Sequence, residues 1–181
     1  PFDAPFNRVG HPLPATIENT ADEVSYRPAS NALAVHETFR LGGGGAKSTG
    51  GRWNSKGTPV VYAATSISLA TLETLTRIDT TTRRNEFLVK ITIPSALWRK
   101  RETVTAADLP PTWLAEPPGA TSIDLGDKWL QSVSTALLLV PSVIVPEEYN
   151  VLINPVHRAS AQITAEVVRQ YIYDPRLKTC R

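Results

Sequence analysis

The sequence predicts a single mixed α+β domain, and three observations carry that prediction. Its 181 residues are enough to bury one hydrophobic core, and 41% apolar with 20% charged content is typical of a soluble globular protein. Residues 86–94 alternate apolar and polar side chains, which predicts a strand. Residues 67–78 instead repeat apolar side chains at helical spacing, directly after Ser66, a favourable N-cap. A strand pattern and a helix pattern in one short chain indicate this class.

Residues 1–22 are punctuated by prolines and lack periodicity, so they are expected to form an arm outside the domain at residues 23–181. A short strand at residues 24–27 should stop at Pro28, and residues 31–39 should hold a brief helical turn before a glycine-rich loop. The later elements are expected to be a central strand at 58–63, the helix at 67–78, the strand at 86–94, an irregular stretch with short helical turns at 95–120, a helix at 124–135, a strand at 137–140 and 143–145 interrupted at Pro141, and strands at 151–154 and 167–173.

Composition narrows the function classes. A net charge of +2, with no block of lysine or arginine, argues against a dedicated nucleic-acid surface. The longest apolar run, residues 136–140, is far too short to span a bilayer. The lone Cys180 and three widely separated histidines give no disulfide framework and no zinc-binding pattern, so no metal is expected. The chain begins with Pro1 and contains no methionine, which leaves open a trimmed start or a domain cut from a longer polypeptide.

Glycine is concentrated in one loop, since seven of the ten glycines lie between Gly42 and Gly57. The loop contains Lys47 and Ser48, but it is not a P-loop, because Ala46 precedes the lysine and no helix starts after the serine. The dinucleotide pattern GxGxxG fails as well, because its third glycine position is not glycine. Dense glycine instead suits a flexible segment whose backbone bends sharply or approaches a ligand closely.

The same loop ends in an arginine, a tryptophan and an asparagine. Lys47, Arg52, Trp53 and Asn54 would be presented together, with the guanidinium suited to phosphate or carboxylate and the indole suited to stacking on a planar ring. This combination fits a nucleotide-like ligand. In the alternative interpretation Trp53 fills the core and Arg52 makes a surface ion pair, and the sequence leaves both open.

Glu73 is a second candidate, because it is the acidic residue on the predicted helix and stands among apolar neighbours. The alternative is a helix-surface pair with Arg77, four residues later. Arg27, at the end of a short strand, and Tyr62, in an apolar strand, are weaker candidates. A serine-nucleophile triad has no support, since no histidine and acid accompany the serines.

Taken in order, the pieces of this sequence resemble the RES-domain toxins, over roughly residues 24–177. The first half of the resemblance is an arginine on an early strand, a GxGA…GGRWN loop, a PVVY strand and a helix with an LE pair. The second half has further matching segments. These pieces lie here at residues 26–27 (YR), 43–46 (GGGA), 50–54 (GGRWN), 59–62 (PVVY), 72–73 (LE), 126–130 (GDKWL), 139–142 (LVPS), 154–157 (NPVH) and 174–177 (DPRL). The ordered series is far more specific than any one piece.

The resemblance implies a compact fold related to the ADP-ribosyltransferases, a mixed sheet with flanking helices, and a toxic activity that consumes NAD⁺. It also implies an arginine, a glutamate and a serine as signature residues. Arg27 and Glu73 carry over directly, whereas Ser142 is the first choice for the serine and Ser132 the second.

A reaction at these residues would pass through an oxocarbenium-like transition state as the nicotinamide–ribose bond breaks. Glu73 would stabilise that cation and bind ribose hydroxyls. Arg27 and Arg52 would hold the pyrophosphate or the ribose, and Tyr62 or Trp53 would stack on the nicotinamide.

The acceptor of the ADP-ribose stays open at this point. Water or phosphate would make the chain an enzyme that degrades NAD⁺, and a protein side chain would make it an ADP-ribosyltransferase. A third hypothesis is a nucleotide-binding module without catalysis. The resemblance further implies action in the cytoplasm and a neutralising antitoxin. The antitoxin, rather than this chain, would bind DNA. A domain of a secreted effector would instead have an immunity protein, and a homodimer is left open.

Overall fold

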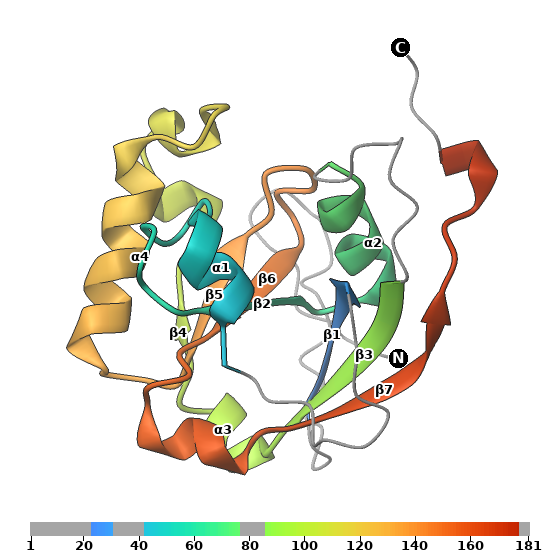
Figure 1. The fold of residues 1–181 in the computed structure, drawn as a ribbon. Helices are drawn as coiled ribbons and strands as arrows, with labels where there is room; N and C mark the ends of the chain where they lie inside the picture. Colours follow the sequence, from blue (N-terminus) through green and yellow to red (C-terminus); the bar gives the residue numbers. More distant parts are fainter. Residues whose placement is uncertain (1–22, 31–41, 77–85, 178–181) are drawn as a thin grey trace, which may run out of the picture.

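The computed structural model describes residues 23–30, 42–76 and 86–177, the first of these ranges as backbone only. The expected arm at 1–22 and helical turn at 31–39 lie outside the described residues. The main elements are β1 (Glu23–Ser30), α1 (Gly44–Thr49), β2 (Val61–Ala64), α2 (Ile67–Leu75), β3 (Glu86–Ile93), α3 (Ser95–Trp98), β4 (Glu102–Thr103), α4 (Ala120–Ser132), β5 (Leu137–Pro141), β6 (Tyr149–Ile153) and β7 (Thr164–Tyr171) (Figure 1). Short 3₁₀ turns lie at η1 (Ala106–Asp108), η2 (Pro111–Leu114), η3 (Arg158–Gln162) and η4 (Pro175–Leu177).

The strands of the described chain form one mixed sheet in the order β4-β5-β6-β2-β1-β3-β7. The short β4 pairs parallel with β5, and every other neighbouring pair is antiparallel. The predicted strand at 58–63 is confirmed as a central strand, although it is shorter and runs from Val61 to Ala64. A mixed sheet with flanking helices confirms the predicted α+β class.

The sheet is covered on both faces at β5, whereas the edge strand β7 is mostly exposed. Its alternate residues enter two different hydrophobic clusters, Leu137 and Leu139 on one face and Leu138 and Val140 on the other. Because successive side chains of a strand point to opposite faces, β5 is buried on both sides along its whole length. A strand of this kind reads as a continuous apolar run, which is why residues 137–140 could be recognised from the sequence.

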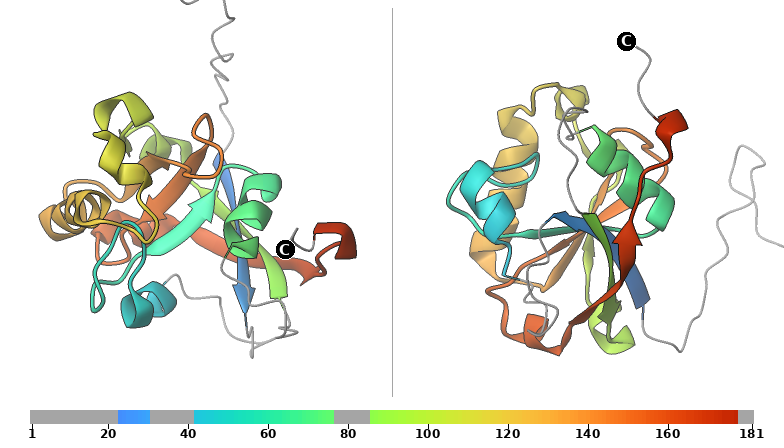
Figure 2. Two further views of the ribbon diagram at one scale, coloured as in Figure 1. Left: turned by 90° about the horizontal axis from the view of Figure 1, so that it is seen from above. Right: turned by 45° about the vertical axis from the view of Figure 1, so that its right-hand side comes forward.

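The helices occupy separate parts of the sheet. α4 lies beside β5, whereas α2 lies beside β1 and β3, and the views of Figures 1 and 2 agree on this. Trp129 and Leu130 of α4 pack against Leu138 and Val140 of β5 and Leu152 of β6. α2 begins at Ser66 as predicted, since the Ser66 hydroxyl accepts the backbone N–H of Leu69 at 3.1 Å.

Two strand predictions need correction. The first strand was expected to stop at Pro28, but β1 continues to Ser30 and pairs with β3 along its length. A proline is compatible with this strand because its other neighbour, β2, pairs with it in the described residues only at Tyr26. Residues 143–145 do not continue β5. The Ser142 hydroxyl accepts the backbone N–H groups of Ile144 and Val145, each at 3.1 Å, and this turns the chain away from the sheet.

Two helices also differ from expectation. The predicted helix at 124–135 starts four residues earlier, after an extended Gly119, and ends where Val133 adopts φ 49°. The glycine loop was expected to be flexible throughout, yet Gly44–Thr49 form the short helix α1. Gly43 (φ 64°) precedes α1 and Gly50 (φ 75°) follows it, so glycine supplies a positive φ at both ends. Within the described ranges, no helix has both the length and the apolar content to cross a lipid bilayer.

Candidate active site

Glu73 lies on α2 and faces the hairpin formed by β5 and β6. Leu69 and Ala70, one helical turn before Glu73, are buried and pack with Ala64 and Val145. Residues three and four apart share a helix face, so the packing of this turn directs Glu73 toward the same hairpin. The apolar contacts of α2 therefore determine where the carboxylate lies.

Two side chains of the hairpin donate hydrogen bonds to one oxygen of Glu73. Ser142 Oγ donates to Glu73 Oε1 at 2.9 Å, and Asn150 Nδ2 donates to the same oxygen at 2.6 Å. Ser142 follows β5 and is fully buried, whereas Glu73 and Asn150 are half-buried. Among the described residues, none is bonded to the other oxygen, Oε2. One oxygen of the carboxylate is thus fixed by the protein and the other faces no described partner.

The segment that starts α2 is tied to the same hairpin. The Thr65 hydroxyl donates to the Tyr149 carbonyl at 3.2 Å, and the Ser66 hydroxyl donates to Glu148 Oε2 at 3.2 Å. The Ser142 backbone N–H in turn donates to the Glu148 carbonyl at 2.9 Å. These contacts hold α2 against β5 and β6, so the distance from Glu73 to its two donors does not depend on a single bond.

Arg52 lies beside the chain around η2. Its guanidinium donates to the carbonyls of Trp113 and Ala115, both at 2.9 Å, and pairs with Glu116 at 2.8 Å. The Arg52 side chain is 12% exposed and that of Glu116 is 76% exposed. Arg52 therefore fastens the glycine-rich segment to the irregular stretch that follows α3.

Trp53 and Asn54 point into the protein interior. Trp53 is 2% exposed, with its ring centroid 6.4 Å from that of Trp113. Asn54 is 1% exposed, and its Nδ2, with two hydrogens to donate, lies 2.9–3.1 Å from the carbonyl oxygens of Ala46, Ser55 and Thr58. These contacts match the alternative in which Trp53 fills the core and Arg52 forms an ion pair. Binding of NAD⁺ by these residues stays a prediction.

Tyr62 joins the loop to the sheet. Its hydroxyl donates to Asn54 Oδ1 at 2.8 Å and accepts the Trp53 backbone N–H at 2.9 Å. The ring is half-buried on β2, the strand that precedes α2. Tyr62 therefore connects β2, the strand before α2, with the glycine-rich segment.

α4 and the glycine-rich segment touch backbone to backbone. A Cβ atom placed on Gly126 would lie 1.9 Å from the Trp53 carbonyl oxygen, far inside any allowed contact. The next residue, Asp127, accepts the Ser55 backbone N–H at 2.9 Å. Two neighbouring positions of α4 thus determine how closely this segment can lie against the helix.

The remaining predicted residues occupy different places. Lys47 is exposed on α1, and Arg27 belongs to β1, where its backbone pairs with Val89 while its side chain lies outside the description. Ser132, at the end of α4, donates to the Trp129 carbonyl at 2.8 Å, and its Oγ lies 3.0 Å from Ser134 Oγ. Ser142, in contrast, contacts Glu73 directly. Arg77, the alternative partner of Glu73, lies outside the described residues.

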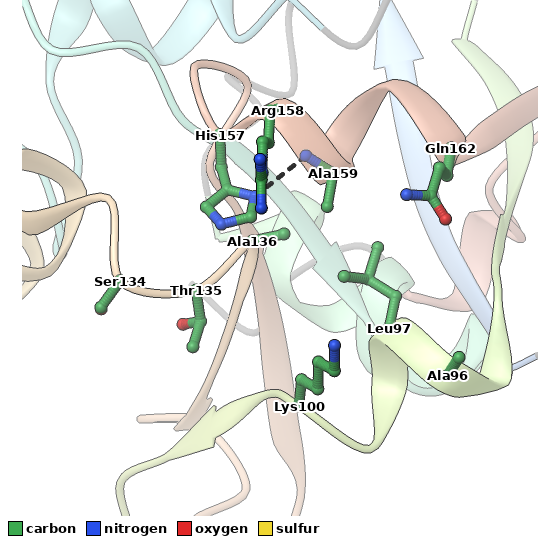
Figure 3. A pocket seen from close by; sticks show the side chains of 10 residues that line it. All are labelled: Ala96, Leu97, Lys100, Ser134, Thr135, Ala136, His157, Arg158, Ala159 and Gln162. Carbon is green, nitrogen blue, oxygen red and sulfur yellow. Dashed lines mark hydrogen bonds between the residues drawn. The ribbon is translucent and has the colours of Figure 1, made fainter.

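A cavity of about 510 Å³ lies at the other end of β5 (Figure 3). Its lining includes the basic side chains of Lys100 and Arg158 and the imidazole of His157, whose Nδ1 accepts the Ala159 N–H at 3.1 Å. Ala136 lines this cavity and Ser142 contacts Glu73, six residues along an extended strand, or about 20 Å. The cavity is therefore separate from the Glu73 cluster. Within the described residues no group of three or more potential metal ligands occurs.

Most of this chain matches a known protein family. The RES domain model matches residues 25–175, from the third residue of β1 to the first residue of η4. The chain belongs to the RES domain family. The match confirms the resemblance drawn from the ordered motifs.

Three relatives of this RES domain are toxins by name. It is 48% identical over 153 residues to "Prs ADP-ribosylating toxin" of Sphingobium sp. (strain YBL2), covering 84% of this chain and 94% of that protein. It is 41% identical over 138 residues to "Toxin Res" of Yersinia enterocolitica, covering 75% and 89%. With "Toxin Res" of Pseudomonas putida it shares 38% over 146 residues, covering 76% and 92%. The chain is therefore a toxin of the RES family.

Sequence reasoning missed one residue of the Glu73 cluster in this RES domain. Asn150 is 77 positions from Glu73, and no spacing rule connects a helix residue to a strand so distant. One signal was available: asparagine is disfavoured inside strands, yet it stands in the apolar strand YNVLI.

Proposed function

We propose that this RES domain is an enzyme that cleaves the nicotinamide–ribose bond of NAD⁺, and that its toxicity follows from the loss of NAD⁺. The supporting observation is the geometry of Glu73. Two donors hold Oε1, and the described residues leave Oε2 able to accept ribose hydroxyls. A carboxylate held in this way is suited to stabilise positive charge that develops on the sugar.

The reaction needs little covalent chemistry from the protein. The bond from the ribose carbon to the pyridinium nitrogen breaks, its electron pair moves to the ring, and neutral nicotinamide leaves. The ribose ring oxygen shares the resulting positive charge, which the Glu73 carboxylate opposes. A lone pair of water or phosphate then forms the new bond, and a proton from that acceptor is released to solvent.

The basic residues complete the proposal. Arg27 and Lys47 are proposed to meet the pyrophosphate, since a guanidinium and an ammonium both suit phosphate oxygens. Arg52, Trp53, Asn54 and Tyr62 are proposed to support the segment that positions Lys47. Ser142 is the proposed signature serine, because it contacts Glu73, whereas the contacts of Ser132 are with Trp129 and Ser134.

The test is an NAD⁺ consumption assay with chromatographic identification of the products. Glu73→Gln keeps the size of the side chain and removes its charge, and it should slow NAD⁺ loss by a factor on the order of 10²–10³. Glu166→Gln, on exposed β7, is the matched control and should behave like the wild type. A Glu73→Gln protein that consumes NAD⁺ at the wild-type rate would refute the assignment.

A second candidate function is protein ADP-ribosylation at the same site. The observation that favours it is the 48% identity with a relative named "Prs ADP-ribosylating toxin", over 94% of that protein. NAD⁺ labelled in its adenylate moiety separates the two functions. Free ADP-ribose or its phosphate supports NAD⁺ degradation, and label retained on a protein supports transfer.

A neutralising partner belongs to the same proposal. Such an antitoxin would act by blocking access to Glu73.

Expression of the chain should arrest bacterial growth, and Glu73→Gln should relieve the arrest. A growth arrest that persists with Glu73→Gln at equal protein levels would place the toxic activity elsewhere.

A further inference from the structure

We propose that Asn150 is a positioning residue for the Glu73 carboxylate, an inference that rests on the proposed function. Its amide fixes one carboxylate oxygen, so that the other is presented to the substrate. The observation is the 2.6 Å bond from Asn150 Nδ2 to Glu73 Oε1. Neither the family match nor the ordered motifs of the sequence pointed to this residue.

The place of Asn150 in the sheet is unusual for its residue type. It lies in β6, between β5 and β2, and its backbone is opposite Val140 on one side and Ala64 on the other. Asparagine is depleted in strands, and a β-branched or apolar residue would suit this position better. Departures from local preference of this kind tend to occur at functional sites.

The orientation of the amide follows from chemistry. If Oδ1 faced the carboxylate, two acceptor oxygens would lie at hydrogen-bond distance and repel each other. Only the NH₂ side can bond Glu73 Oε1, and a bond to a charged acceptor is stronger than one to a neutral acceptor. Among the described residues, the Asn150 side chain donates its hydrogen bond to Glu73.

Ser142 and Asn150 differ in what else they hold. The Ser142 hydroxyl also accepts two backbone N–H groups of the turn after β5, so replacing it would disturb the hairpin as well as Glu73. Among the described contacts, the Asn150 side chain makes no second hydrogen bond of this kind. Substitutions of Asn150 therefore report on Glu73 more directly than substitutions of Ser142.

Three variants test the proposal. Asn150→Ala removes the donor and should lower kcat/KM for NAD⁺ loss by about 10- to 100-fold, as expected for a hydrogen bond to a charged group. Asn150→Asp places a second carboxyl group at the same distance, and the two groups would then share one proton. Gln131→Glu, on the exposed face of α4, is the matched amide-to-acid control.

The pH profile separates positioning from a purely structural role. In Asn150→Asp the acid limb of kcat/KM should move to higher pH by about one unit or more, while Gln131→Glu should keep the wild-type limb. The other described titratable groups near this hairpin and α2 are Glu147, Glu148, Tyr149 and Tyr171, and all four are present in every variant. Equal melting temperatures would show that the variants are folded.

A second readout does not depend on catalysis. The carboxyl ¹³C signal of residue 73, assigned with Glu73→Gln, should titrate at higher pH in Asn150→Asp than in the wild type. This shift is expected even if the chain does not consume NAD⁺, so failure of the proposed function can be told apart from failure of this inference. An unchanged carboxyl titration together with an unchanged acid limb would overturn the positioning role, as would wild-type kcat/KM in Asn150→Ala.

Discussion

Replacing Gly126 by alanine should destabilise the fold, although alanine is the better helix former. Gly126 is buried in the middle of α4, where Gly→Ala is ordinarily worth about 1 kcal/mol in favour of alanine. Here the new Cβ would lie 1.9 Å from the Trp53 carbonyl oxygen, 2.7 Å from its carbon and 3.0 Å from Trp53 Cα. All three are backbone atoms, so no side-chain rotation can relieve the overlap.

The size of the effect follows from the required movement. An ordinary carbon–oxygen contact needs about 3.2 Å or more, so α4 and the Trp53 segment must separate by more than an ångström. Overpacking of this kind costs about 1–3 kcal/mol or more, and the lost contacts of buried Trp53 add to that cost. After the gain in helix propensity, the net loss should be about 2 kcal/mol. For a chain of this size that corresponds to a melting temperature lower by about 4–8 °C.

The assay is thermal or urea unfolding of Gly126→Ala beside Gly45→Ala. Gly45 lies in α1, and a Cβ there would meet nothing within 4 Å, so Gly45→Ala should be neutral or stabilising by up to about 1 kcal/mol. A Gly126→Ala protein as stable as the wild type, or more stable, would refute the reasoning. It would show that α4 can withdraw from the Trp53 segment at little cost.

Two more perturbations test the segment and the loop before η1. Arg52→Ala should lower the free energy of unfolding by about 1–3 kcal/mol, because the carbonyls of Trp113 and Ala115 lose their donors. Glu116→Ala, which removes an exposed partner of Arg52, should lower it by less than about 1 kcal/mol. Urea unfolding measures both values. Hydrogen bonds from the Thr105 hydroxyl and backbone N–H lower the pKa of the Asp108 carboxyl below its usual 3.8. The ionised carboxylate therefore stabilises the fold above pH 3.8, and this stabilisation is lost as the pH falls through the lowered pKa. Asp108→Asn should therefore flatten the acid dependence of the free energy of unfolding below about pH 4, and an unchanged slope would contradict this.

Patterns of local origin could be predicted from the sequence. The alternation of β3, the apolar run of β5 and the serine cap of α2 all follow from side chains close together in the chain. The end of β1 could not be predicted, since Pro28 is tolerated only because of how little of β1 pairs with β2. The same holds for residues 143–145, which are apolar enough for a strand until the Ser142 hydroxyl captures their N–H groups.

Some residues of the candidate site could likewise be predicted from the sequence, and others could not. Glu73 was a candidate from its place on the predicted helix and again from the family resemblance, whereas Ser142 came from the resemblance alone. The structure places the two in contact at 2.9 Å. Asn150 could not be found by spacing, because its relation to Glu73 exists only in the contact between α2 and β6. The interior positions of Trp53 and Asn54 depend on Tyr62 and on the close approach of α4, both of which are tertiary features.

The separation along the chain between Glu73 and its donors has a consequence for biosynthesis. Ser142 is 69 residues and Asn150 is 77 residues downstream, and both lie on the hairpin completed by β6. Contacts of such high sequence separation form late, because a long loop must close before they are made. A ribosome must therefore release residues beyond 150 before the carboxylate is oriented. Until that point the proposed enzyme would be inactive, because neither donor to its carboxylate is in place.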